Sequence, residues 1–465
     1  MIDLVLLAFI GYVLVLGLRR PFLWVLLYVY IDILAPQRIG YGIITSVPVS
    51  LIAFAAAFGG WLALDRKDGV RFTARQGLLL ALLLYCWWTT GHADFAEEAA
   101  TKWDWVWKSL LFAIFLPFTL TTRARIEGLA TVLVLTVATI VIGAAMKTVL
   151  GGGGYGTLAF FVNDNSGIYE SSTLATIAIG LVPIVWWVVR YGTIFPKHWT
   201  VVLFAAALTF ACLLIPVGTE ARTGLLCIAA LAGLMLRYTK RRLLFVAGAG
   251  VLALTAIPFL PQSFYQRMST IAEHDGDESA STRVAVWQWT LDYVAERPFG
   301  GGFDAYRSNR FTYTMPVKVT DGNTTSVTYR EVEDKARAFH SSIFEMLGEQ
   351  GWPGLIMWAL LHLMGLWQME RLQRRWRRRS ADEEEDEATR WIAPLAGALQ
   401  MGAVIYLVGA TFQGIAYQPV MLMLAGLQIG LNTYCSRIDS ERRDLARKTA
   451  RRAPTTPDVA GAVAA

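Results

Sequence analysis

A single histidine stands where a long polar segment gives way to strongly apolar sequence. His340 lies in residues 337–342, Arg-Ala-Phe-His-Ser-Ser, close to the end of that polar segment. A neutral imidazole at such a boundary can take a proton from a hydroxyl acceptor, which is general-base chemistry. A lone histidine is more often structural, so packing of this segment is the alternative interpretation. His340 is the first candidate catalytic residue.

An arginine opens one of the apolar segments. Arg222 lies in residues 218–224, Gly-Thr-Glu-Ala-Arg-Thr-Gly, a very short connection that leads directly into apolar sequence. A charge at that depth is costly and needs a partner. Pairing with Glu220 or another carboxylate is the structural interpretation. The functional interpretation is a ligand phosphate, because a guanidinium presents a fork of donors that fits phosphate oxygens.

Two further cations are candidates for the same ligand. Arg283 begins an amphipathic segment of the polar stretch, where a surface position is the simpler interpretation. Lys102 lies among Trp103, Trp105 and Trp107, which are typical of an interfacial aromatic belt. We predict that Arg283 contacts phosphate and that Lys102 is a secondary contact.

No metal and no cofactor are expected. No paired metal-ligand spacing surrounds His340, and the acidic run at residues 275–278 is too short for a calcium loop. The sequence carries neither a Walker loop nor a dinucleotide fingerprint, so coupling to ATP is unsupported.

The elements that must position these residues are membrane helices. The chain of 465 residues is 55% apolar and only 17% charged, with a mean hydropathy of +0.44. These values exclude a soluble enzyme, a disordered chain, a secreted disulfide scaffold and nucleic-acid binding as the meaning of the pI near 9.1. We predict an all-α polytopic membrane protein with 12–13 transmembrane helices. The candidate spans are residues 2–18, 21–35, 44–64, 77–90, 106–120, 128–150, 171–189, 199–216, 223–236, 243–261, 352–369, 393–411 and 417–434.

Charge predicts the orientation of these spans. About two thirds of the 42 lysine and arginine residues fall on alternate connections. The positive-inside rule places those connections in the cytoplasm, and thirteen spans then place the N-terminus outside and the C-terminus inside. The run at 21–35 holds Asp32 and ends at Pro36. A re-entrant or interfacial element there would reduce the number of spans to twelve.

One long polar insertion, residues 261–350, interrupts the apolar runs on the outer side. We predict a large, mainly helical periplasmic loop, with an amphipathic helix at 282–296, extended or hairpin structure at 311–330 and helix again at 331–350. Gly351-Trp-Pro-Gly354 should break that last helix just before the next span. The predicted organisation is N-terminal transmembrane helices at 1–261, a periplasmic loop at 262–351, C-terminal transmembrane helices at 352–435 and a cytoplasmic tail at 436–465.

The order of these motifs resembles the O-antigen ligase and polymerase superfamily of bacterial membrane glycosyltransferases. In chain order the motifs are Thr219-Glu-Ala-Arg222-Thr-Gly, Ser281-Thr-Arg283 with Trp287, Arg297-Pro-Phe-Gly300-Gly-Gly302, and His340 followed by Glu349, Gly351 and Gly354. The resemblance covers about residues 170–370. The N-terminal part resembles the O-glycosylation ligases associated with exosortase systems. Ser341 departs from the pattern, because many relatives have asparagine after the histidine.

The resemblance implies transfer of a glycan from undecaprenyl pyrophosphate to lipid A–core at the periplasmic face of the bacterial inner membrane. Arg222 and Arg283 would hold the pyrophosphate and stabilise its developing charge without a metal. Lys102 would add a weaker contact. His340 would activate the acceptor hydroxyl on the opposite face of the sugar carbon, so the configuration of that carbon would invert.

Other functions stay open at this point. An O-antigen or exopolysaccharide polymerase and a protein O-oligosaccharyltransferase belong to the same group of reactions. A transporter or flippase is less favoured, because such proteins usually show inverted repeats and broken helices at the midplane. The expected partners are the lipid-linked donor, the acceptor and membrane lipids, with no nucleic acid.

Overall fold

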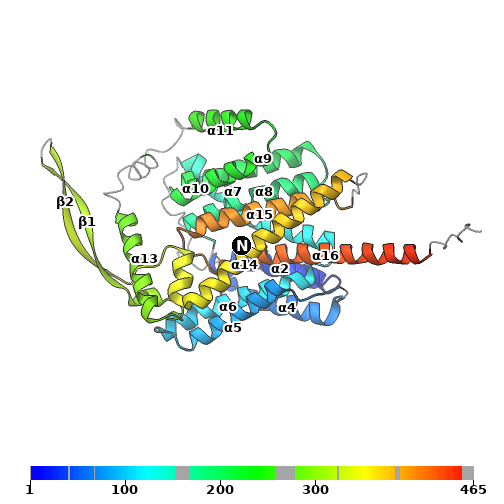
Figure 1. The fold of residues 1–465 in the computed structure, drawn as a ribbon, viewed down its shortest axis with the longest axis horizontal. Coiled ribbons are helices and arrows are strands. Elements are labelled where there is room, and N and C mark those ends of the chain that lie inside the picture. Colours follow the sequence, from blue (N-terminus) through cyan, green and yellow to red (C-terminus); the bar gives the residue numbers. More distant parts are fainter. Residues whose placement is uncertain are drawn as a thin grey trace, which may run out of the picture.

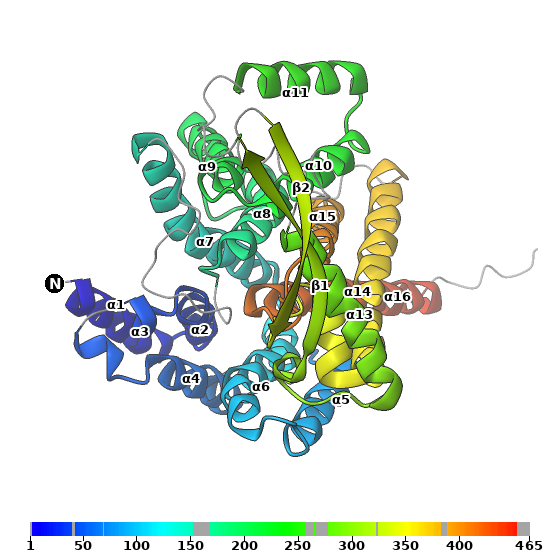
Figure 2. The same ribbon diagram turned by 90° about the vertical axis from the view of Figure 1, so that its left-hand side faces the viewer.

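The computed structural model describes residues 2–39, 42–67, 69–151, 168–256, 265, 278–321, 324–382 and 388–452. Most of them form one bundle of helices (Figure 1). Its helices before the polar insertion are α1 (Ile2–Gly17), α2 (Phe22–Leu34), α3 (Pro36–Ile39), α4 (Val49–Leu64), α5 (Ala74–Thr90), α6 (Ala96–Thr119), α7 (Arg123–Gly151), α8 (Ser171–Tyr191), α9 (Trp199–Gly218) and α10 (Arg222–Leu236), with a short 3-10 turn η1 (Ile43–Thr45) before α4. Helix α11 (Arg242–Ala256) lies apart from this bundle, as Figure 2 shows.

The insertion and the C-terminal part add further elements. They are α13 (Glu278–Glu296), a 3-10 turn η4 (Ala305–Ser308), strands β1 (Arg310–Asp321) and β2 (Thr324–Lys335), and helices α14 (Ser342–Asp382), α15 (Ile392–Ala410) and α16 (Pro419–Arg452). The predicted tail at 436–465 does not begin as a separate segment, because α16 continues through it to Arg452. The acidic run at 275–278 lies outside the described residues except for Glu278.

Each of the thirteen predicted runs overlaps a helix, and four of those helices meet the length and hydropathy of a membrane span. These four are α8, α9, α15 and residues Arg123–Leu150 of α7. Apolar helices of 10–17 residues account for four more of the runs, namely α1, α2, α4 and α10. A multi-pass all-α membrane protein is therefore supported, and the number of 12–13 spans stays a prediction.

Helix α2 shows why one of the predicted spans was open to two interpretations. Its 13 residues measure about 20 Å, which is shorter than the ~30 Å hydrocarbon layer. Tyr28, Val29 and Ile31 are fully buried, and Tyr28 donates a hydrogen bond to Asp32. The left-handed backbone of Ala35 (φ 46°) then ends the helix before Pro36. By its length, α2 favours the alternative of a re-entrant or interfacial element.

Two opposite ends of the bundle differ in chemistry. Figure 1 shows α13 and the hairpin at one end, which we call the loop end, and Figure 2 views the molecule from that side. At the opposite end, which we call the basic end, the connections that we predict to be cytoplasmic contact one another. Arg125 binds Asp65 at 2.6 Å, Arg123 donates to the Tyr191 carbonyl, and Arg437 donates to the Thr121 carbonyl.

Close helix packing fixes the middle of the bundle. Helices α8 and α15 cross where Gly180 and Gly402 face each other, and a Cβ atom built on Gly402 would lie 2.8 Å from the Gly180 carbonyl oxygen. Small residues allow two membrane helices to approach this closely. Each of these two helices runs from one end of the bundle to the other, so together they position residues at both the loop end and the basic end.

The insertion is less helical than predicted. The 19-residue α13 confirms the amphipathic helix, and β1 and β2 confirm the extended segment as an antiparallel hairpin of 12 residues a strand, pairing Arg310 with Lys335 and Asp321 with Thr324. The prediction of a helix over residues 331–350 was wrong for the first part of that range. Residues 331–335 continue the ladder opposite Arg310–Thr314, and α14 begins only at Ser342. Helix and hairpin therefore contribute comparably to the described part of the insertion.

The predicted break at Gly351 is present. Helical backbone geometry is interrupted at this residue, where φ is 61° and ψ is −166°, and Pro353 lies just beyond in the next turn. The left-handed Gly300 (φ 79°) packs against this kink, and the left-handed Gly302 (φ 77°) packs against Ala93. Their loop forms backbone hydrogen bonds to the kink, from Gly301 to Gly348 and from Gly302 to Glu349. The Arg-Pro-Phe-Gly-Gly-Gly motif thus joins α13 to the kink of α14.

Candidate functional site

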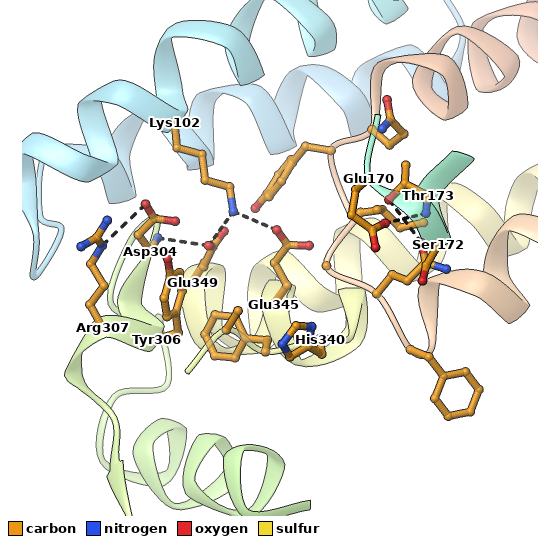
Figure 3. Close-up of a pocket in the computed structure, with 18 of the residues that line it drawn as sticks. Lys102, Glu170, Ser172, Thr173, Asp304, Tyr306, Arg307, His340, Glu345 and Glu349 are labelled. Carbon is orange, nitrogen blue, oxygen red and sulfur yellow. Dashed lines mark hydrogen bonds and ion pairs between the residues drawn. The ribbon is translucent and has the colours of Figure 1, made fainter. Parts of the chain in front are cut away.

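A cavity of about 770 Å³ lies at the loop end of the bundle. Its walls come from α6, the start of α8, α13, the segment 304–307, residues 338–340, the first turns of α14 and the segment 412–418 that follows α15 (Figure 3). Three of the four predicted site residues line it: Lys102, Arg283 and His340. The fourth, Arg222, is not among the lining residues. The structure therefore brings together side chains separated by more than two hundred positions in the sequence.

His340 lies at the wall of the cavity with its side chain exposed to it. In the part of the chain that the structure describes, its ring nitrogens form no hydrogen bond, so both can meet a ligand. Partial burial, followed by the charges of Arg283 and Arg337, lowers the pKa of His340 below its ordinary value, and Glu170 opposes this effect. This lowered pKa favours the neutral imidazole, which is the form that a general base requires.

The backbone at His340 is held in an unfavourable conformation. His340 has φ 48°, and Ala336 four residues earlier has φ 54°. Left-handed backbone at a residue other than glycine costs of the order of 1–3 kcal/mol and persists where the surroundings impose it. Such residues concentrate at functional sites, so the strain supports a role for the segment 336–340 beyond connecting β2 to α14.

Asn309 imposes this conformation from the other side of the hairpin. Its side-chain nitrogen donates to the Arg337 carbonyl at 2.7 Å, and its side-chain oxygen accepts from the Arg337 backbone N–H at 2.9 Å. The Asn309 carbonyl also accepts from the Ala336 N–H at 3.1 Å. Asn309 is fully buried. We did not predict Asn309 from the sequence, because a single asparagine before a strand carries no distinguishing spacing.

Trp287 holds the same segment from α13. Its indole N–H donates to the Phe339 carbonyl at 2.9 Å, and its ring stacks on Phe344 with centroids 4.9 Å apart. The predicted motif of Arg283 followed by Trp287 thus occupies one turn of α13, with the arginine at the cavity and the tryptophan on the backbone next to His340.

The serines after His340 connect α14 to the segment 412–418. Ser342 donates to the Gln413 carbonyl at 2.8 Å and accepts from the Ile415 N–H at 2.9 Å. Ser341 is buried, and its hydroxyl oxygen has no hydrogen-bond partner among the described residues. The side-chain contact that fixes the start of α14 therefore comes from Ser342.

Lys102 is bound by two carboxylates. Its ammonium group lies 2.8 Å from Glu345 and 2.7 Å from Glu349, as Figure 3 shows. The side chains of Lys102, Glu345 and Glu349 are only 14%, 8% and 1% exposed. The two carboxylates raise the pKa of Lys102 against the opposing effect of burial. This lysine is an internal counter-ion, which weakens the prediction that it contacts phosphate.

The second carboxylate of this cluster has an altered proton affinity. Burial raises the pKa of Glu349 to about 8, with Lys102 lowering it and Glu345 raising it. One oxygen of Glu349 accepts from Lys102 and from the Asp304 backbone N–H, whereas the other has no hydrogen-bond partner within the described ranges. Burial likewise raises the pKa of Asp304. Both shifts favour retention of a proton by the carboxylates of this cluster.

The sequence contained one signal for this cluster. Glu345 and Glu349 are four residues apart, so a helix places them on the same face, where two like charges repel. A buried pair of that kind requires a cation, and Lys102 is supplied by α6, 243 positions earlier than Glu345. Glu345 also accepts from the Ala416 N–H at 3.0 Å, so the cluster links α6, α14 and the segment 412–418.

Arg222 lies at the first position of α10, at the loop end of the bundle. It is half-buried and follows Glu220, which has left-handed backbone (φ 53°). Two residues later, a Cβ atom built on Gly224 would lie 2.9 Å from the Ala175 side chain of α8. Ala175 is within one turn of Thr173, which lines the cavity. Helix α10 therefore packs against α8 beside the cavity, and Arg222 itself is not among the residues that line the cavity.

The charge of the cavity wall is mixed. Five carboxylates line it, together with Arg283, Lys102, Arg307 and the neutral His340; the carboxylates are those of Glu98, Glu170, Asp304, Glu345 and Glu349. Across the described residues no group of three or more histidine, cysteine, aspartate or glutamate side chains is placed to hold a metal ion. Of the cations that line the wall, Arg283 has the largest effect on the pKa of His340. The acidic cluster lies on the α6 side of the cavity (Figure 3).

Comparison with known families agrees with the motif order. Residues 206–359 match a family model described as O-antigen ligase, and residues 1–193 match a family of unknown function (DUF5935). No curated protein matches the chain. The predicted resemblance to the O-antigen ligase and polymerase superfamily is confirmed, over a segment that includes Arg222, Arg283 and His340. The resemblance of the N-terminal part to exosortase-associated ligases stays a prediction.

Proposed function

We propose that this chain, with its O-antigen ligase segment at residues 206–359, transfers a glycan from undecaprenyl pyrophosphate to lipid A–core on the periplasmic face of the bacterial inner membrane. The family match supports a glycosyltransferase of the ligase or polymerase type. The donor, the acceptor, the inverting and metal-independent mechanism and the side of the membrane are the proposed part.

One observation carries the proposal. A neutral histidine and an arginine line the same cavity of about 770 Å³, at the end of two helices that are long and apolar enough to span a membrane. A lipid-linked donor presents its diphosphate at the membrane surface, so a reaction on it needs a base and a cation at that depth.

Each residue then has a defined part in the reaction. A nitrogen of His340 takes the proton of the acceptor hydroxyl while the acceptor oxygen forms a bond to the anomeric carbon of the donor sugar. The bond from that carbon to the diphosphate oxygen breaks, and the electron pair leaves with undecaprenyl pyrophosphate. Arg283 stabilises the charge that gathers on the leaving oxygens. Attack from the face opposite the leaving group inverts the anomeric configuration.

The other predicted cations have different roles in the proposal. Arg222, at the first position of α10 and outside the cavity lining, would bind the part of the diphosphate that extends toward α10. Lys102 would act indirectly, because its charge is balanced by Glu345 and Glu349. It positions the first turns of α14, and with them His340.

The test is a transfer assay with the purified chain, an undecaprenyl-pyrophosphate-linked glycan and lipid A–core that lacks O-antigen. We expect one glycan to be added to lipid A–core, with the rate unchanged by EDTA. Arg283→Ala should abolish transfer, and the matched variant Arg330→Ala, in an exposed position of β2, should not. Extension of the donor glycan by further repeats would show a polymerase instead. Equal rates for the two variants, or a strict metal requirement, would contradict the proposed mechanism.

A further inference from the structure

A second cavity lies at the basic end of the bundle. Its volume is about 410 Å³, and it is bounded by the end of α8, the start of α15, α14 and the turn after α10. The first cavity adjoins the start of α8 and the end of α15, so the two cavities are on opposite ends of the same pair of helices. The 21 residues of α8 measure about 30 Å, which matches the thickness of the hydrocarbon layer. The second cavity is therefore at the opposite membrane surface.

Arginine and apolar side chains dominate this cavity. Arg190, Arg377 and Arg390 line it, and none of the lining residues is acidic. The remaining wall is largely apolar and aromatic, with Trp186 and Met401 as examples. A site of this composition offers cationic donors at its rim and hydrocarbon contact within.

The arginines of this cavity differ from neighbouring arginines of α14, which form ion pairs with a carboxylate. Arg375 and Arg379 both bind Asp439 at 2.7 Å. Among the described residues, neither Arg190 nor Arg377 forms an ion pair. Orientation of a membrane protein depends on the number of basic residues on a side, and does not require them to surround a cavity.

A polar contact at the wall supports the same arrangement. The guanidinium of Arg377 lies 5.7 Å from the ring centroid of Tyr238. The Tyr238 hydroxyl in turn exchanges hydrogen bonds with the buried Gln373 at 2.9–3.2 Å. Tyr238 is thereby fixed against α14, and its ring contacts the exposed Arg377 at the rim of the cavity.

We propose that this second cavity binds the phosphate headgroup of an anionic glycerophospholipid. The arginines would bind the phosphate oxygens, and the acyl chains would lie along the apolar wall that α8 and α15 present at the membrane surface. With the predicted orientation of the chain, this lipid belongs to the cytoplasmic leaflet. The site is independent of the proposed transfer reaction, which takes place at the loop end.

The test measures lipids retained by the purified protein. The variant Arg190→Gln/Arg377→Gln/Arg390→Gln removes the three cations of the cavity. The control Arg66→Gln/Arg241→Gln/Arg378→Gln removes the same charge from exposed positions outside the cavity, on connections predicted to be on the same side. Native mass spectrometry after exchange into detergent with phosphatidylglycerol or phosphatidylcholine gives the retained lipid.

We expect the cavity variant to retain at least about tenfold less phosphatidylglycerol than wild type, with the control unchanged and phosphatidylcholine weak throughout. Equal losses in the two triple variants would show that overall charge holds the lipid, and would overturn the proposal. If the cavity variant does not fold, the adjacent pair Arg377→Gln and Arg378→Gln makes the same comparison with one charge each.

Two other occupants give different results. Retention of inorganic phosphate at the arginines, without retention of phosphatidylglycerol, would identify a soluble anion site and overturn the proposal. The acidic sequence at residues 383–387 follows α14 and precedes Arg390, so it is the rival within the chain. If wild type does not bind phosphatidylglycerol and a variant with those five residues changed to glutamine or asparagine does, the chain itself occupies the cavity and the proposal fails.

Discussion

Replacement of Lys102 by methionine removes the one cation between two buried carboxylates. The ammonium group is 2.8 and 2.7 Å from Glu345 and Glu349, whose side chains are 8% and 1% exposed. Removing one partner of a buried ion pair typically costs about 3–5 kcal/mol, because the remaining charge is left without compensation. For 465 residues the entropy of unfolding is roughly 1 kcal/mol/K, so the melting temperature should fall by about 3–5 °C.

The same helix supplies a matched control. Lys108 pairs with Asp104 at 3.0 Å, but Asp104 is 73% exposed, and a pair of this kind contributes only about 0.3–0.5 kcal/mol. Lys108→Met should therefore leave the melting temperature within about 1 °C of wild type. Adding Glu345→Gln and Glu349→Gln to Lys102→Met should recover most of the lost stability, since neither carboxylate that paired with Lys102 then carries a charge.

The assay is thermal unfolding of the purified protein in detergent, followed by intrinsic tryptophan fluorescence. Equal melting temperatures for Lys102→Met and Lys108→Met would refute the reasoning. So would a neutralised triple variant that is less stable than Lys102→Met, because that result would assign the stability to hydrogen bonding by the carboxylates and not to charge balance.

Three further predictions concern protons and the segment that carries His340. The pKa of Glu349 is about 8 in the folded protein and 4.5 ordinarily, so between these pH values the folded protein keeps a proton that the unfolded chain releases. The free energy of unfolding should therefore fall as the pH rises from 4.5 to 8. Glu349→Gln should flatten the profile of melting temperature against pH over this range. The transfer rate should fall only below neutral pH, as His340 becomes protonated, and Arg337→Gln, which removes a charge that lowers the His340 pKa, should move the fall to higher pH in a pH–rate profile. Asn309→Ala should cost about 1–3 kcal/mol in thermal unfolding and lower kcat more than it raises KM, since the buried backbone groups of Arg337 lose their partners; unchanged profiles or an unchanged kcat would count against each prediction in turn.

Local sequence was sufficient to predict most of the helices. Hydropathy over a dozen or more residues predicted the runs that form the bundle, and the abundance of Thr, Val and Tyr predicted the hairpin. The boundary at 331–341 was wrong because the charged residues there suit a helix by composition. Their pairing with β1 prevails, since each strand residue as far as Lys335 has a partner opposite it.

The site was only partly predictable. His340 and Arg222 stand out because a histidine or arginine beside apolar sequence is costly and therefore conspicuous. Arg283 lies in a polar stretch, and its assignment to phosphate came from the resemblance to the ligase and polymerase superfamily. Lys102 was found for its position among tryptophans, and its part in the structure differs from the predicted phosphate contact. The hydrogen bonding of Asn309 to Arg337 and the pairing of Lys102 with α14 depend on residues brought together by the tertiary fold, which spacing along the chain does not reveal.

The most direct test of the central claim is single-turnover transfer by purified His340→Gln, measured together with binding of the lipid-linked donor. Glutamine retains some hydrogen bonding but accepts no proton at neutral pH. If His340 is the general base, the transfer rate should fall by about 10²–10⁴-fold while donor affinity and melting temperature stay close to those of wild type. A normal rate, or loss of binding in parallel with loss of folded protein, would contradict the assignment of His340 as the base.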